Sequence, residues 1–166
     1  MRTVLVLLAL SLLSACWQVE GDSVPAEAAI RVEGVKDGIY RRNDGNELVV
    51  RWNAAERVYD IGGGGVGAGK ARAMRVGETL ALVQFTGNLR LALLATLTGD
   101  DLVMLGPTPA VEKRLAAKHG VVLRPGPINH LSGPPSAVKA YVAEAATLPA
   151  ADLVEAGRLV YGGALH

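Results

Sequence analysis

The histidines and one pair of adjacent carboxylates are the residues best suited to bind a metal or to move a proton. The histidines are His119, His130 and His166, and the acidic pair is Asp100 and Asp101. A metal site needs several converging ligands, but no His-x-x-x-His or His-Glu pattern is present. The acidic pair lies in a predicted turn, where aspartates are common. We therefore expect no metal site and no cofactor.

The glycine-rich stretch 62–70 has the spacing of a phosphate-binding loop. Gly64 is followed by four residues and then by Gly69 and Lys70, but Ala71 stands where a magnesium-binding Ser or Thr is needed. Such a loop also leads into a helix, whereas the residues that follow favour a strand. We interpret the stretch as a flexible connection between strands, in which glycines would let a partner's backbone approach closely.

Ser136 and Lys139 have the spacing of the serine–lysine pair of penicillin-recognising enzymes, and a helix would bring the two side chains together. Those enzymes need two further motifs, and neither is present. We expect Ser136 to be a local capping residue and Lys139 to be a solvated charge. No catalytic residue is predicted, and the chain is expected not to be an enzyme.

The composition narrows the possible classes of protein. The 166 residues include 17 basic and 16 acidic ones, which gives a formal net charge of +1. Such a chain has neither the basic footprint of a nucleic-acid-binding protein nor the polybasic stretch that anionic lipids attract. Cys16 is the single cysteine, so an intramolecular disulfide and a cysteine-rich zinc site are excluded.

The first residues have the pattern of an export signal. Arg2 gives a positive start, and Val4 to Leu13 form an apolar run that is too short to cross a bilayer as a helix. Small residues then precede Cys16, as expected before a cleavage site. The alternative is an ordinary cleavable signal with a chance or buried cysteine at its end.

The stretch Leu13-Ser14-Ala15-Cys16 resembles the lipobox of bacterial lipoproteins. The resemblance implies that Cys16 carries a thioether-linked diacylglycerol, that cleavage falls just before it, and that the new amino group is acylated. The expected location is the bacterial cell envelope. Trp17 stands where some lipoproteins carry an Asp that retains them in the inner membrane, so we expect the outer membrane, facing the periplasm.

The sequence predicts three segments. Residues 1–15 form the lipoprotein signal peptide, residues 16–28 the lipidated cysteine and a flexible tether, and residues 29–166 a single α+β domain. The tether is assigned because it is polar and lacks sustained periodicity. The segment 29–166 is long enough to bury a core of its own.

Short β-favouring runs joined by tight turns, from about residue 30 to 105, predict an antiparallel meander. Asp44-Gly45 between two such runs is a hairpin signal for a type I′ turn, which needs positive φ at both positions. The apolar run 89–97 fits a strand or a helix, since short runs are ambiguous.

The last third of the chain changes to a helical period. One helix is predicted from Thr108-Pro109 to Gly120, a second from Pro134-Pro135, and a third from Pro149 to about Leu159. The second helix has one apolar stripe, made by Val138, Tyr141, Val142 and Ala145. The predicted fold class is α+β, with an antiparallel β-meander, either open or curled into a half-barrel, followed by two or three C-terminal helices packed on it.

The expected function is that of a lipid-anchored envelope protein with a non-enzymatic structural or adaptor role. Its expected partners are the membrane, through the lipid on Cys16, and another envelope protein, with no nucleic acid. The alternative is a periplasmic module that binds a small ligand in an apolar half-barrel pocket. A sizeable apolar cavity would favour the ligand module, and an exposed apolar patch or edge strand would favour the adaptor.

Overall fold

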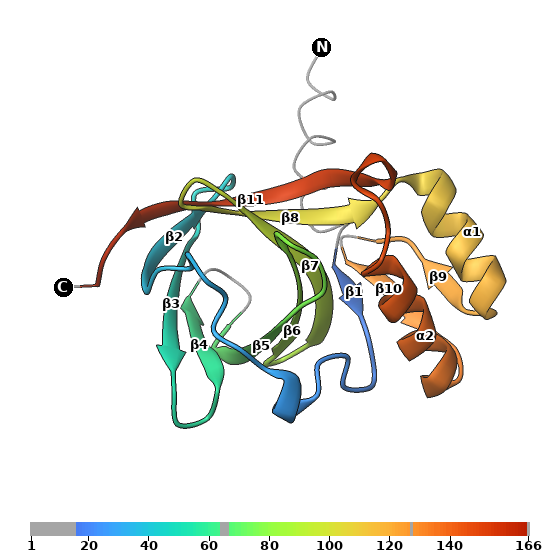
Figure 1. Ribbon diagram of the computed structural model, residues 1–166, viewed down its shortest axis with the longest axis horizontal. Coiled ribbons are helices and arrows are strands. Elements are labelled where there is room, and N and C mark those ends of the chain that lie inside the picture. Colours follow the sequence, from blue (N-terminus) through green and yellow to red (C-terminus); the bar gives the residue numbers. More distant parts are fainter. Residues whose placement is uncertain (1–15, 64–66, 127, 166) are drawn as a thin grey trace, which may run out of the picture.

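The computed structural model describes residues 16–63, 67–126 and 128–165. Eight antiparallel strands close into a barrel, and two short helices lie beside its outer wall (Figure 1). The predicted signal peptide 1–15 lies outside the described residues. Within the described part of the chain, no helix is both long and apolar enough to cross a membrane.

Seven consecutive strands form an up-and-down meander, and β11 closes it by pairing with both β2 and β8. The ladder between β6 and β7 joins the two halves of the wall. All eight barrel strands pair antiparallel with their neighbours. Their bounds are β2 (Gly38–Arg42), β3 (Glu47–Asn53), β4 (Val58–Gly63), β5 (Gly69–Arg75), β6 (Leu80–Thr86), β7 (Arg90–Thr98), β8 (Asp101–Pro107) and β11 (Leu153–Gly163).

The predicted α+β fold, an open meander or half-barrel followed by two or three C-terminal helices, is wrong. The barrel is closed, and the two α-helices of the described chain are inserted between β8 and β11. The predicted third helix, Pro149 to Leu159, is instead a 3-10 turn, η3 (Ala150–Asp152), followed by β11. Gly157 weakens a helix there, and β11 satisfies the open edges of β2 and β8.

The hairpin between β2 and β3 lies where it is predicted, but its turn differs. Gly45 has φ of +83°, while Asp44 does not have a positive φ, so the turn is not type I′. The ambiguous run 89–97 is extended, since β7 covers nearly all of it. A strand is favoured there because β6 and β8 offer ladders on both sides.

The first helix begins and ends close to its predicted limits, and the second begins where it is predicted. α1 (Pro109–His119) follows Thr108 and ends at Gly120, which adopts the left-handed conformation with φ of +64°. α2 (Pro135–Ala145) buries its predicted apolar stripe. Between the helices lie β9 (Val122–Arg124) and β10 (Asn129–Ser132).

The segment expected to be a tether packs on the barrel. β1 (Trp17–Gln18) pairs antiparallel with β7 and parallel with β10. The backbone amides of Ser23 and Val24 donate to the Gln84 side-chain oxygen on the outer face of β6. The chain then passes through η2 (Ala26–Ala28) before it enters β2.

Two hydrophobic cores result, one on each face of the barrel wall. The outer core joins Trp17 and both helices to Leu82 and Leu94. The inner core surrounds Tyr40 and Tyr59 inside the barrel. Because successive side chains of a strand point to opposite faces, β6 and β7 contribute to both cores and are apolar on both faces.

Candidate functional site

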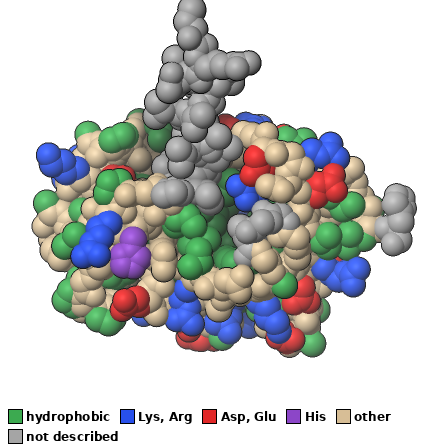
Figure 2. All heavy atoms as spheres, turned by 180° about the vertical axis from the view of Figure 1, so that it is seen from behind, with side chains coloured by type: hydrophobic (Ala, Val, Ile, Leu, Met, Phe, Trp, Pro, Cys, Tyr) green, Lys and Arg blue, Asp and Glu red, His purple; other side chains and the backbone are tan. Residues whose placement is uncertain are grey.

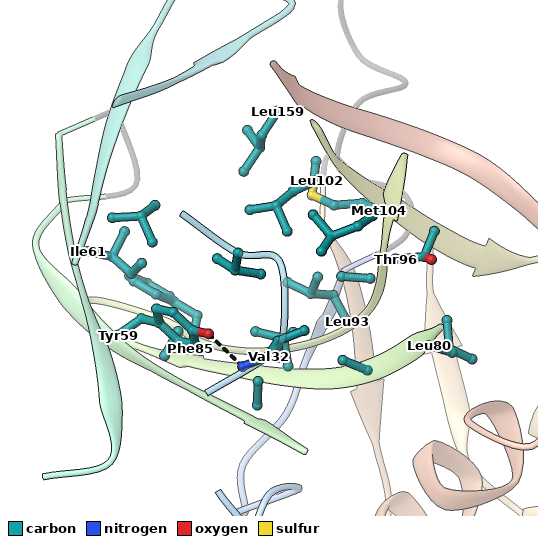
Figure 3. A pocket seen from close by; sticks show the side chains of 18 of the residues that line it. Val32, Tyr59, Ile61, Leu80, Phe85, Leu93, Thr96, Leu102, Met104 and Leu159 are labelled. Carbon is teal, nitrogen blue, oxygen red and sulfur yellow. Dashed lines mark hydrogen bonds between the residues drawn. The ribbon is translucent and has the colours of Figure 1, made fainter. Parts of the chain in front are cut away.

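The barrel encloses an apolar cavity of about 370 Å³. Figure 3 shows its side chains converging from most of the wall, with Leu93, Leu102 and Met104 facing Ile61 and Phe85 across the interior. Eight strands give an interior just wide enough to be filled by side chains or to hold one small ligand. The volume lies in the range of small-molecule sites.

The cavity exists because several inward positions carry small side chains. Alternation along the strands aims Ala71 and Ala73 of β5, Ala81 of β6 and Ala95 of β7 at the interior. Each is buried, with an exposed fraction of at most 7 %. Larger residues at these four positions would fill the space, as side chains do in barrels with solid cores.

Two hydroxyl groups among the residues that line the cavity, those of Tyr59 and Thr96, already have hydrogen-bond partners. The Tyr59 hydroxyl accepts a hydrogen bond of 2.8 Å from the Val32 amide (Figure 3), and burial raises the pKa of this phenol. The Thr96 hydroxyl donates to the Thr79 carbonyl at 2.8 Å. An apolar ligand therefore suits the interior, because such a ligand needs no hydrogen bonds from the wall.

The two ends of the barrel differ. Antiparallel order places the β2–β3, β4–β5 and β6–β7 connections at one end, here named the Arg42 end, and the β5–β6 turn at the other, named the Glu78 end. The segment 29–36 crosses the Glu78 end. Its contacts include those from Ile30 N to Ala73 O (2.8 Å), from Val32 N to Tyr59, from the Arg57 side chain to Ala29 O, and from Lys36 to Asp100 (2.7 Å).

The Arg42 end is lined by Cys16, Arg42 and Asn43. Figure 2, seen from behind, shows a hollow with hydrophobic side chains on the face opposite to that of Figure 1. Arg42 forms an ion pair of 3.0 Å with Asp44 in the hairpin turn. The cavity thus has an apolar interior and a polar rim at this end.

Cys16, the predicted lipidation site, lies in the cavity wall. It is buried, with 3 % exposed, and its carbonyl accepts a hydrogen bond of 3.2 Å from the Asn129 amide. Burial raises the pKa of the Cys16 thiol to about 12, and the nearby positive charge of Arg42 only partly opposes this. A buried, protonated thiol is inert, so any attachment to it would precede closure of the fold.

The glycine stretch 62–70 connects β4 to β5. Gly64 to Val66 lie outside the described residues, and Gly69 and Lys70 belong to β5. Lys70 forms an ion pair with Glu56 of the β3–β4 turn. No helix follows Lys70, so the described residues lack the helix N-terminus that a phosphate-binding loop requires.

The other candidate residues do not come together. Ser136 and Lys139 are exposed on α2. His119 ends α1 and pairs with Glu144 at 2.8 Å, whereas His130 belongs to β10. His166 lies outside the described residues.

Asp100 lies in the turn before β8, as predicted, whereas Asp101 is the first residue of β8 and contacts Arg158 at 3.4 Å. In the described ranges, no three His, Cys, Asp or Glu side chains are grouped as metal ligands would be.

The sequence predicted an apolar pocket only as the alternative, without its lining residues, and did not indicate the role of Glu112. The small, alternating alanines of β5 were the available signal for the cavity. Glu112 is half-buried and accepts hydrogen bonds from the Trp17 and Asn129 side chains. Comparison with protein-family models, curated proteins and solved structures finds no match for this chain.

Proposed function

We propose that this protein is a lipid-anchored protein of the bacterial envelope whose barrel holds one small apolar ligand. The observation that carries the proposal is the cavity of about 370 Å³, whose interior is aliphatic and aromatic. A much smaller apolar cavity, of about 150 Å³, stays dry and binds benzene. The proposed ligand is therefore a hydrocarbon chain or ring system with few polar atoms.

The proposed role is binding without catalysis. The interior hydroxyls of Tyr59 and Thr96 serve the fold, as acceptor and donor to backbone groups. General acid–base or nucleophilic chemistry needs polar groups that reach a bound substrate. The apolar lining supports storage or transfer of a ligand rather than its conversion.

The adaptor role expected from the sequence stays a prediction. The exposed large apolar side chains include Val49 on β3, Leu89 in the β6–β7 turn, Val122 on β9, and Val154 and Val160 on β11. They are spread over several elements, whereas docking surfaces usually present one contiguous patch. The cavity is thus the more specific feature.

The ligand proposal is tested by photolabelling in native membranes. A fatty acid that carries a diazirine on its chain is added to membranes, irradiated, and the labelled peptides of the protein are mapped by mass spectrometry. Labels are expected on inward residues such as Leu93 and Met104, which line the cavity. Labels confined to outward residues would contradict the proposal.

A matched pair of substitutions sharpens this test. Ala73→Leu adds three carbons inside the cavity, while Ala55→Leu adds the same atoms at an exposed position in the β3–β4 turn. Ala73→Leu should lower interior labelling about tenfold, equivalent to about 1.4 kcal/mol, and Ala55→Leu should not. Equal labelling of the two variants would argue against a ligand in the barrel.

The proposed anchor has its own measurement. The intact mass of the protein extracted from membranes should correspond to a chain that begins at Cys16 and carries a diacylglycerol and one further acyl group. Cys16→Ser should lack these additions, because serine has no thiol for the thioether. An unmodified Cys16 in the extracted protein would contradict the lipobox assignment.

A further inference from the structure

We infer that the Arg42 end of the barrel faces the lipid bilayer, and that the bilayer supplies the apolar ligand directly to the cavity. The inference rests on the proposed function, since it uses both the anchor on Cys16 and a ligand in the barrel. It adds the source of the ligand and the surface through which the ligand enters.

The first support is that the anchor point is part of the cavity wall. Cys16 lines the cavity together with Arg42, whose charge acts on the Cys16 thiol. A diacylglycerol attached to this sulfur through a thioether would leave the protein at this end of the cavity. The hydrophobic surface of the membrane and that of the cavity would then be adjacent.

The second support is that the residues directly after Cys16 are held on the barrel wall by hydrogen bonds and strand pairing. The Cys16 carbonyl is bonded to Asn129, and the next residue, Trp17, is fully buried and pairs with Ala92 of β7. A flexible linker would let the barrel rotate and move away from the membrane. Here strand pairing at Trp17 holds one end of the barrel at the lipid.

The third support is that the opposite end is covered. The segment 29–36 crosses the Glu78 end, and Val32 of this segment reaches into the cavity wall. Gly34 has φ of +85°, and a Cβ there would lie 2.9 Å from the Leu97 side chain. The segment therefore packs closely, which leaves the Arg42 end as the route for an apolar molecule.

The charged residues at the cavity rim do not explain how the barrel would be oriented on the membrane. At the rim, Arg42 pairs with Asp44 at 3.0 Å and Arg158 with Glu155 at 2.9 Å. Such neutralised cations add little attraction for anionic lipids, which need net positive clusters. We therefore expect the orientation to come from the covalent anchor and to be independent of anionic lipid content.

The experiment uses two reporter positions, Asn43→Cys and Glu78→Cys, which are exposed and lie at opposite ends of the cavity. Protein purified from membranes is labelled with a nitroxide and placed in phosphatidylethanolamine vesicles, with and without phosphatidylglycerol. Accessibility is measured to oxygen, which concentrates in lipid, and to a water-soluble nickel complex. The Asn43 reporter should favour oxygen and the Glu78 reporter nickel in both vesicle types.

The control inserts about twelve Gly and Ser residues between Cys16 and Trp17, a linker with an average reach of about 20 Å. With this linker, the two reporters should become equally accessible to the nickel complex. Equal accessibility in the protein without the linker would overturn the inference. If the orientation is absent but Leu93 and Met104 are still photolabelled, the ligand proposal stands without this inference. If the two reporters differ as expected but Leu93 and Met104 are not photolabelled, the proposed ligand is contradicted while the orientation stands.

Discussion

The indole nitrogen of Trp17 donates a hydrogen bond of 3.2 Å to the Glu112 carboxylate. The side-chain amide of Asn129 donates to the same oxygen, also at 3.2 Å. Glu112 thereby joins the residue next to the proposed anchor to α1 and β10. Burial raises the pKa of this carboxyl, and the two hydrogen bonds only partly offset the effect.

Glu112→Gln should change how stability depends on pH. The pKa of Glu112 in the folded protein is raised above its ordinary value of 4.5. The contribution of this carboxyl to the free energy of unfolding therefore falls as pH rises from below 4.5 through the folded pKa. Glutamine keeps an acceptor for Trp17 without the charge. Relative to the variant, the wild-type protein should lose stability between about pH 4 and pH 7, and solvent screening should reduce this loss because the carboxyl is part exposed.

Urea denaturation of the two full-length proteins at both pH values measures this difference. Glu112→Ala is the control, because it removes the carboxylate that accepts from the Trp17 indole and should cost about 1–3 kcal/mol at either pH. A wild-type to Glu112→Gln difference that does not change with pH would show that the carboxyl is not perturbed.

Tyr59→Phe should loosen the segment that covers the Glu78 end. The substitution removes the acceptor of the Val32 amide and leaves that amide unsatisfied. The expected loss of unfolding free energy is about 1–3 kcal/mol. Hydrogen exchange of the Val32 amide should accelerate more than that of Leu94, which lies in the outer core. Unchanged exchange at Val32 would mean that this hydrogen bond does not hold the segment.

Val142→Asp should unfold or strongly destabilise the protein. Val142 is 1 % exposed in the core between α2 and the barrel, so an unpaired carboxylate there should cost several kcal/mol. Lys139→Asp, on the exposed face of the same helix, should cost less than about 0.5 kcal/mol. Chemical denaturation midpoints compare the two variants, and equal midpoints would contradict the assignment of the stripe to the core.

Lys70→Ala should leave the protein nearly as stable as the wild type. Lys70 pairs with Glu56, and both side chains are about half exposed; such pairs contribute about 0–1 kcal/mol. The wild-type protein should bind neither ATP nor GTP in the presence of magnesium, as measured by calorimetry. Magnesium-dependent binding that Lys70→Ala abolishes would restore the phosphate-loop interpretation.

Local signals in the sequence determined several elements of the fold. Thr108-Pro109 and Gly120 delimit α1, and the apolar stripe that includes Val142 identifies the buried face of α2. These features depend on backbone stereochemistry and on helical period within one segment. The lipobox assignment at Cys16 is equally local and stays a prediction of the sequence.

The tertiary structure alone decided the closed barrel, the cavity and the place of Cys16 in its wall. The residues Leu153–Gly163 become a strand because β2 and β8, distant in the sequence, each have one edge that no other strand of the barrel pairs. Ala73 borders an empty interior only once eight strands surround it. Such properties arise from pairing between remote segments, whose energy no local window of the sequence contains.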